Sequence, residues 1–321
     1  MRRRVAALLL AAIVVVVGGC GAQASVSGSE DVGLLLDFTP NAVHAGIYTA
    51  RARGFDGGEG VRLHIRVPGQ STDAVRLLAA GRVDLAVLDI HDLALARRRG
   101  VDIVGVMPLV QRPLAAVIAA PGVRSPRALA GRRVGVTGLP SDEAVLRSIV
   151  RGAGGDPARV RVTQIGFGAV GALLARRVDG ATAFWNVEGV VVHRRRPGFR
   201  VFRVDDFGAP PYPELVLCAT RRTLRERPEA VRGTVRALRR GYEQVLTDPE
   251  SSLADLEQGT RGLDRKLLAA ELDAVTPAFF DAHDRAGVFD RRRLQAWARW
   301  EAEFGIVPSP PDVARAFAFS L

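Results

Sequence analysis

From Val32 onward, short apolar runs rich in valine, isoleucine and leucine alternate with amphipathic helical segments. The strand-like runs of the first part are VGLLL (32–36), VRLHIRV (61–67), VDLAVL (83–88) and VDIVGV (101–106), and helical patterns cover 42–53, 72–80 and 91–99. Strands separated by helices of this length are typical of βαβ units with a parallel sheet. The pattern therefore predicts a first α/β unit.

The same alternation starts again after AAPGVRSPRALAG (119–131). The predicted strands are RRVGVTG (132–138), RVRVTQI (159–165), GATAFW (180–185) and FRVFRV (199–204), and helices are expected near 141–151, 168–177 and 187–194. A second α/β unit follows from this repetition.

The last part of the chain is mostly helical. A strand, ELVLCAT (214–220), follows the proline-rich GAPPYP, and beyond about Arg225 the expected helices lie near 228–247, 250–258, 264–274 and 290–304. A return strand after the second unit indicates two chain crossings, near 119–122 and 209–214, with a hinge and a cleft between two lobes. The predicted division is lobe one over 32–119 and 214–321, and lobe two over 120–213.

The N-terminus has the pattern of an export signal over residues 1–19. Three arginines after Met1 precede a short apolar segment, Val5 to Val17, and VGGC ends in Cys20. The apolar segment is shorter than the roughly 20 residues of a spanning helix. A cysteine at the cleavage site resembles a lipoprotein signal, although Val17 replaces the usual leucine. We expect Cys20 to be lipidated, residues 20–31 to form a flexible tether, and Cys218 to remain a buried free thiol.

Composition and motifs exclude several classes of function. The net charge of +11 comes from arginine, because Lys266 is the only lysine. The arginine triplets at 97–99, 194–196 and 291–293 lie apart from aromatic residues, which favours a solvated surface over nucleic-acid binding. The chain has no phosphate-binding loop with Lys-Ser/Thr, no paired cysteines, no HExxH and no GxSxG. We therefore expect no catalytic residue, no metal site and no nucleic-acid partner.

Candidate binding residues follow predicted strands, where open α/β sheets bind ligands. In the segment LLLDFTPNAVHAGIYTA (34–50), an apolar strand is followed by a turn that contains a carboxylate, an aromatic ring, an amide and an imidazole. The loops PGQSTD (68–73), TGLPSDE (137–143) and FWNVEG (184–189) have the same context, although GQS fits a plain helix cap and FWNVEG fits a core tryptophan with a solvent-facing glutamate. Two rings and two carboxylates converging from two lobes would suit a flat heteroaromatic ligand with N–H donors. The candidate ligand-binding residues are Asp37, Phe38, Asn41, His44, Tyr48, Gln70, His91, Trp185, Asn186 and Glu188.

With these residues in view, the chain resembles the solute-binding proteins of ABC importers that bind pyrimidine precursors of thiamine. The resemblance runs from about Val32 to Asp312 and rests on LLLDFTPNAVHAGIYTARARGF, AAGRVDLAVLDIHDLALARRRG, LVQRPLAAVIA, FWNVEGV and VDDFGAPPYPELVL. It implies a two-lobe periplasmic-binding-protein fold of type II with an aminopyrimidine in the cleft. It also implies permease and ATPase partners, a monomer without cofactor, and an extracytoplasmic location anchored to the cell membrane.

A related branch of this family consists of pyrimidine synthases that consume their own histidine with pyridoxal phosphate held on a lysine. His91 resembles the counterpart of that histidine, but Val87 or Leu88 stands where the lysine is expected, and the branch's cysteine cluster is absent. The chain is therefore not expected to be an enzyme. It also departs from the importer branch, because Phe38 replaces a tryptophan and PSDEAVL lacks an aromatic residue. Riboflavin or an aliphatic sulfonate remains an alternative ligand, although Asp37 and Glu188 argue against a sulfonate.

Overall fold

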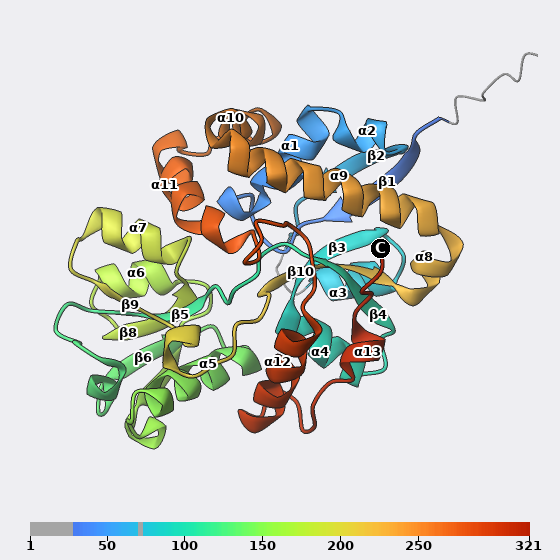
Figure 1. The fold of residues 1–321 in the computed structure, drawn as a ribbon. Coiled ribbons are helices and arrows are strands. Elements are labelled where there is room, and N and C mark those ends of the chain that lie inside the picture. Colours follow the sequence, from blue (N-terminus) through green and yellow to red (C-terminus); the bar gives the residue numbers. More distant parts are fainter. Residues whose placement is uncertain (1–27, 70–72) are drawn as a thin grey trace, which may run out of the picture.

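The computed structural model describes residues 28–69 and 73–321, and these form two α/β lobes (Figure 1). The sheet of lobe one has the strand order β2-β1-β3-β10-β4, with β10 antiparallel to both of its neighbours. All six residues of β4 are buried, as expected for a strand covered by helices on both faces. The strands are β1 (Glu30–Leu35), β2 (Val61–Arg66), β3 (Leu85–Asp89), β4 (Ile103–Pro108) and β10 (Leu215–Thr220).

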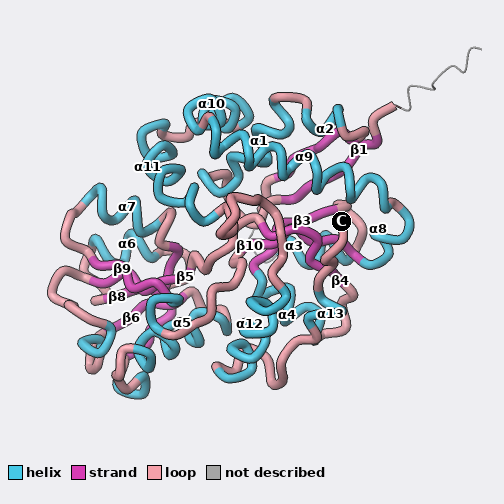
Figure 2. The backbone as a smooth tube through the Cα atoms, in the orientation of Figure 1, coloured by secondary structure: helices cyan, strands magenta, loops and turns pink. Residues whose placement is uncertain are grey.

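The sheet of lobe two has the order β7-β6-β8-β5-β9, with β5 antiparallel to β8 and β9. Figure 2 shows the two sheets as separate groups of strands, each surrounded by helices. The two-lobe α/β fold predicted from the sequence is confirmed. The strands are β5 (Ala115–Ala119), β6 (Arg133–Val136), β7 (Arg161–Gln164), β8 (Gly180–Phe184) and β9 (Arg200–Arg203).

The first crossing between the lobes lies earlier than the sequence pattern indicated. Strand β5 pairs with lobe two, with Ala115 opposite Phe184, so the chain crosses between Pro108 and Ala115 rather than at 119–122. An apolar run identifies a buried strand but not the sheet that it joins, which is why residues 115–119 were assigned to lobe one. The return crossing lies between β9 and β10, and the two crossing segments contact each other, since Leu114 N donates to Glu214 Oε2 at 2.6 Å.

Helices cover both faces of the lobe-one sheet. The long helix α9 crosses α1 so closely that a Cβ on Gly241 would lie 2.0 Å from Gly46 O, and only glycine fits there. The helices before β4 are α1 (Ala45–Ala52), α2 (Phe55–Gly58), α3 (Asp73–Ala79) and α4 (Ile90–Arg98). Those after β10 are α8 (Arg221–Glu226), α9 (Pro228–Thr247), α10 (Pro249–Gly259), α11 (Arg265–Val275), α12 (Arg291–Glu303) and α13 (Val313–Ala316).

Lobe two carries the helices α5 (Pro140–Gly152), α6 (Ala169–Leu174) and α7 (Glu188–Arg195). Short 3-10 turns punctuate both lobes: η1 (Ala42–His44), η2 (Pro126–Leu129), η3 (Pro157–Arg159), η4 (Val204–Phe207) and η5 (Thr276–Ala278). Because the first turn of α5 and the first turn of α7 both face lobe one, these two helices present lobe two's polar side chains to the cleft.

The C-terminal tail, assigned to lobe one from the sequence, contacts both lobes. Trp300 on α12 donates its indole N–H to Ser148 Oγ on α5 at 3.1 Å, and Arg147 donates to Phe304 O at 2.6 Å. Figure 1 shows α12 beside α5 and below the lobe-one sheet. The lobes are therefore joined by two crossings and by this docked helix.

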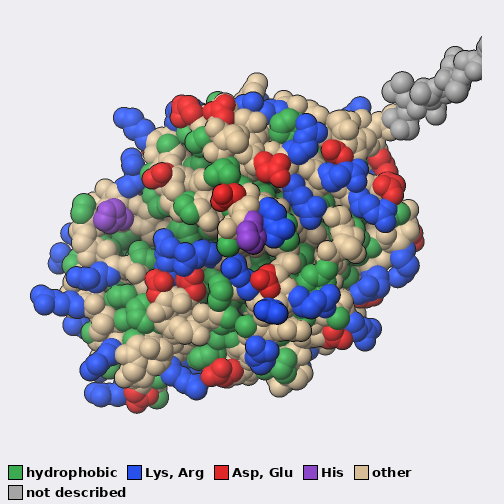
Figure 3. All heavy atoms as spheres, in the orientation of Figure 1, with side chains coloured by type: hydrophobic (Ala, Val, Ile, Leu, Met, Phe, Trp, Pro, Cys, Tyr) green, Lys and Arg blue, Asp and Glu red, His purple; other side chains and the backbone are tan. Residues whose placement is uncertain are grey.

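The surface and the N-terminal predictions have separate outcomes. Figure 3 shows arginine side chains spread over the visible face and interspersed with carboxylates, without one basic patch. Cys218 is fully buried, and burial raises the pKa of its thiol.

Strand β1 begins at Glu30, so the predicted tether ends two residues earlier than expected, whereas the predicted signal and Cys20 lie outside the described residues. None of the helices in the described ranges is long and apolar enough to cross a bilayer.

Candidate functional site

A cavity of about 160 Å³ lies between the lobes, at the carboxyl ends of strands from both sheets. Its wall is formed by the loop after β1, the end of β3, the first turn of α5, the loop after β7 and the loop after β8. A water molecule needs at least about 10–15 Å³ on this measure, so the cavity has room for roughly ten non-hydrogen atoms. A single substituted heteroaromatic ring matches this size.

Asp37 in this wall is held by a buried histidine. The backbone N–H of Asn41 donates to His44 Nδ1 at 3.2 Å, so the ring hydrogen lies on Nε2 and donates to Asp37 Oδ1 at 2.9 Å. His44 is fully buried and does not line the cavity, contrary to the expectation that it binds the ligand directly. It positions Asp37 instead, which leaves Asp37 Oδ2 for a ligand.

Asn41 lines the cavity, but local structure occupies its side chain. Its Oδ1 accepts from Val43 N at 3.0 Å and its Nδ2 donates to Thr39 O at 3.1 Å, which caps the turn η1. Asn41 therefore shapes the loop that carries Asp37 and Phe38 more than it offers hydrogen bonds to a ligand.

The side chain of Asn186, unlike that of Asn41, is open to a ligand. It lies in the cavity wall with no exposed surface, and neither its Nδ2 nor its Oδ1 has a hydrogen-bond partner among the described residues. An unpaired buried polar group costs about 1–3 kcal/mol, so the open donor and the open acceptor of Asn186 fit a molecule in the cavity that supplies both partners.

Glu188 lies beside Asn186 at the start of α7 and also lines the cavity. Its Oε2 accepts from Phe184 N at 3.2 Å, so Oε1 remains available. Burial raises the pKa of the Glu188 carboxyl, against hydrogen bonds from the backbone.

Two phenylalanines from opposite lobes meet at the cavity. The rings of Phe38 and Phe167 lie 6.1 Å apart at an angle of 37°, and Phe167 is 58% exposed. Phe167 was not predicted from the sequence, although a phenylalanine between two glycines shortly after a strand is an available signal. Its partner Phe38 was predicted.

Trp185, expected to be the second ring of the site, does not line the cavity. Its indole N–H donates to Pro113 O at 2.9 Å, and the Arg203 guanidinium lies 3.9 Å from its ring centroid. Successive side chains after a strand point to opposite faces, and here Phe184 and Asn186 face the cavity while Trp185 faces the hinge. The reading of Trp185 as a buried structural residue holds.

The wall is strongly acidic. Five carboxylates line the cavity, and no arginine, lysine or histidine does so in the part of the chain that the structure describes. Asp142 comes from the TGLPSDE loop, where its Oδ2 accepts from Thr137 N at 2.7 Å and from the Thr137 hydroxyl. Burial raises the pKa of Asp142 against these hydrogen bonds. Asp89, Asp92 and Asp142 were not predicted as site residues, although all three lie within segments that the sequence analysis quoted.

Three other predicted site residues have different places. Tyr48 is buried against α10, where a Cβ on Gly259 would lie 2.3 Å from its ring, and it does not reach the cavity. Tyr48 lies on the face of α1 that packs against α10 and therefore points away from the cavity, and the local sequence does not reveal which face this is. Gln70 lies outside the described residues. His91 is 2% exposed and lies behind the cavity wall.

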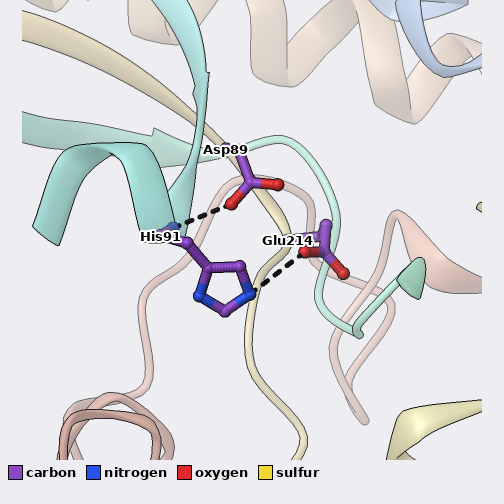
Figure 4. A group of neighbouring side chains, drawn as sticks. All are labelled: Asp89, His91 and Glu214. Carbon is purple, nitrogen blue, oxygen red and sulfur yellow. Dashed lines mark hydrogen bonds and ion pairs between the residues drawn. The ribbon is translucent and has the colours of Figure 1, made fainter. Parts of the chain in front are cut away.

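His91 belongs to a buried ion-pair network beside the hinge. Figure 4 shows its Nε2 facing Glu214 and its backbone N–H donating to Asp89, at 3.5 Å and 2.8 Å respectively. Its Nδ1 contacts Glu301 on α12. Glu214 Oε2 in turn accepts from Leu114 N at 2.6 Å and from Ala115 N at 2.9 Å. One histidine thus connects α4, α12 and both crossing segments.

The charge of His91 distinguishes this network from a metal site. Ligand atoms of Asp89, His91 and Glu214 lie within 4.8 Å of one another, a spacing that a bound cation would also use. Burial lowers the pKa of His91, but Glu301, Asp89 and Glu214 outweigh it and raise the pKa to about 10. Metal ligation needs a neutral imidazole, so a protonated His91 favours the ion-pair interpretation near neutral pH.

Two α/β lobes joined by two crossings, with a cavity between them, define a periplasmic-binding-protein fold. Solved structures of this fold are similar over most of their length. The periplasmic aliphatic sulphonate-binding protein of Escherichia coli has a TM-score of 0.72 and 16% identity, covering 90% of this chain and 97% of that one. The periplasmic nitrate-binding protein of Synechocystis PCC 6803 has a TM-score of 0.70 and 10% identity, covering 90% and 86%. At these identities the likeness shows the fold alone.

The chain belongs to the NMT1/THI5-like family, whose sequence model matches residues 41–252. A formylaminopyrimidine-binding protein of Halalkalibacterium halodurans is 33% identical over 227 residues, covering 70% of this chain and 69% of that protein. A 4-amino-5-hydroxymethyl-2-methylpyrimidine phosphate synthase of Legionella pneumophila is 26% identical over 226 residues, covering 69% and 71%. The family resemblance predicted from the sequence is confirmed.

Proposed function

We propose that this protein is the extracytoplasmic solute-binding component of an ABC importer and that it binds an aminopyrimidine precursor of thiamine. The observation that carries the proposal is Asn186, a buried amide in the cleft with an open donor and an open acceptor. A 4-aminopyrimidine presents the complementary pair, because its exocyclic amino group donates and the neighbouring ring nitrogen accepts.

The rest of the site fits the same ligand. Glu188 offers a second acceptor beside Asn186, and Asp37, held by His44, offers another from lobe one. A ring stacked between Phe38 and Phe167 needs two contacts of about 3.5–4 Å, so their centroids must move about 1–2 Å apart from the observed 6.1 Å. Ligand entry therefore requires a small rotation of these rings or of the lobes.

The alternative ligands fit less well. An aliphatic sulfonate is an anion and needs cationic or N–H donors, whereas this cavity presents five carboxylates and no basic side chain among the described residues. Riboflavin has more than twice as many non-hydrogen atoms as a cavity of about 160 Å³ accommodates. The charge and the size of the cavity therefore favour an aminopyrimidine, the class of ligand named for the formylaminopyrimidine-binding relative.

A pyridoxal-phosphate-dependent synthase is the competing class of function, since several relatives are named as pyrimidine phosphate synthases. The only lysine of the chain, Lys266, is exposed on α11 and does not line the cavity. His91, the counterpart of the consumed histidine by resemblance, is enclosed by carboxylates behind the wall. These placements support a binding protein over a synthase.

The importer role brings further components to the proposal. Lipidation of Cys20 would hold the protein at the outer face of the cell membrane, and closure of the lobes around the ligand would present a defined surface to the permease and its ATPase. The protein would act as a monomer, because one chain supplies both walls of the cleft.

Titration calorimetry of the purified protein without its first nineteen residues tests the proposal. The probes are 4-amino-5-hydroxymethyl-2-methylpyrimidine, its formylaminomethyl analogue, riboflavin and taurine. We expect binding of at least one pyrimidine and none of taurine. Asn186→Ala should weaken pyrimidine binding by roughly tenfold to a hundredfold. The matched control is Gln258→Ala, which removes an exposed amide on α10. Wild-type affinity in folded Asn186→Ala protein would refute the assignment of the site.

A further inference from the structure

The acidic residues of the cleft come from both lobes. Lobe one contributes Asp37, Asp89 and Asp92, and lobe two contributes Asp142 and Glu188. Among the described residues, none of them pairs with an arginine or lysine within ion-pair distance, and Asp37 pairs only with His44. Both walls of the cleft are therefore acidic, and the positive charge of His91 that acts on Asp89 and Asp92 lies behind the lobe-one wall rather than in the cavity.

Like charges at opposing walls oppose the closure of the lobes, because their repulsion grows as the separation falls and as water leaves the cleft. Burial raises the pKa of Asp89, Asp92 and Glu188, and for the two aspartates it outweighs the opposite effect of the His91 charge. Positive charge delivered into the cleft would remove the repulsion and link the two walls.

The free oxygens show where such a charge can bind. Asp37 uses Oδ1 for His44 and Glu188 uses Oε2 for the Phe184 amide, so each keeps one oxygen for the cavity. Asp92 lines the same cavity from the first turn of α4. An ammonium group has three N–H donors and can bond carboxylates of both lobes at once, which a hydroxyl or a formamide cannot do.

We infer that the cleft selects a flat-ring ligand that carries a primary ammonium group on a methylene substituent, and that this ammonium group links the acidic walls of the two lobes. The inference rests on the proposed function and refines it: among aminopyrimidines, the aminomethyl compound is the preferred ligand over the hydroxymethyl and formylaminomethyl compounds. The ring occupies the side of Asn186 and the two phenylalanines, and the ammonium occupies the carboxylates.

Calorimetry with two pyrimidines that differ in one group tests this. The probes are 4-amino-5-aminomethyl-2-methylpyrimidine and 4-amino-5-hydroxymethyl-2-methylpyrimidine, compared at neutral pH. Hydrogen bonds to a charged group contribute about 1 kcal/mol more than neutral ones, so we expect the aminomethyl compound to bind roughly fivefold tighter. Asp92→Asn, which keeps the shape and removes the charge, should reduce this ratio. Glu143→Gln, on the exposed side of α5, should leave it unchanged.

The outcomes separate the two proposals. Equal affinity for both pyrimidines in the wild-type protein would overturn the ammonium inference and leave the proposed function standing. If neither pyrimidine binds, the proposed function fails, and benzylammonium against benzyl alcohol then decides the inference. A preference for benzylammonium that Asp92→Asn reduces would support it. No preference, or no binding of either compound, would overturn it.

Discussion

Glu271 on α11 gives a sharp test of how charge is arranged around the cleft. Its side chain is 3% exposed, and its Oε2 has no hydrogen-bond partner among the described residues. Burial and the nearby Glu188 carboxylate raise the pKa of Glu271 to about 7, against a hydrogen bond from the Ala42 backbone. Because α11 packs against α7, this carboxyl on the lobe-one side lies next to the acidic wall of lobe two.

The magnitude follows from proton linkage. A rise from the unfolded value of 4.5 to about 7 is about 2.5 pH units, or about 3 kcal/mol at 1.36 kcal/mol per unit, reduced to about 2–3 kcal/mol by solvent screening. The raised pKa means that the folded state favours the protonated carboxyl. This stabilisation is complete below about pH 4.5 and is lost as the pH rises through about 7.

The perturbation is Glu271→Gln, which keeps the acceptor for Ala42 and cannot ionise. We expect the free energy of unfolding of the mutant to exceed that of wild type by an amount that grows by about 2–3 kcal/mol as the pH rises from about 5 to about 8.5. Urea unfolding at a series of pH values measures this difference, and Glu143→Gln, with an exposed carboxyl paired to Arg147, is the control. Parallel stability profiles for wild type and Glu271→Gln would refute the argument that Glu271 is held as a buried acid.

Further predictions concern the rings, the hinge network, the anchor and the motion. Phe167→Ala should weaken pyrimidine binding by about 0.5–1.5 kcal/mol beyond the lost contact area, measured by calorimetry, whereas equal loss for all ligands regardless of ring would count against stacking. His91→Gln should lower the stability by about 3–5 kcal/mol near pH 6, because it leaves Glu301 unpaired, and thermal unfolding should show the difference shrinking as the pH rises through about 10. Cys20→Ser should release the protein from membranes in cell fractionation, and an intact signal in the exported protein would contradict this. Small-angle scattering should show contraction on saturation with a pyrimidine, and an unchanged profile would exclude closure of the lobes.

Local patterns in the sequence determined the α/β architecture and the general place of the site. Alternating apolar runs and amphipathic segments are sufficient to recognise buried strands and their covering helices, because each residue's burial depends on the period of its own element. The rule that ligands lie at the carboxyl ends of strands led to Asp37, Phe38, Asn186 and Glu188, and all four line the cavity. The motif resemblance added the family, which no composition or periodicity could supply.

Only the tertiary structure decided which segments meet. Strand β5 joins lobe two through pairing with residues about 65 positions later, and no local pattern records such a partner. Trp185 and Asn186 alternate in direction, but which of them faces the cleft depends on the packing of β8 against the hinge. The convergence of Asp92, Asp142 and Phe167 on one cavity likewise depends on the docking of two lobes. The period of a sequence gives the alternation of faces, whereas the identity of each face is set by contacts between residues far apart in the chain.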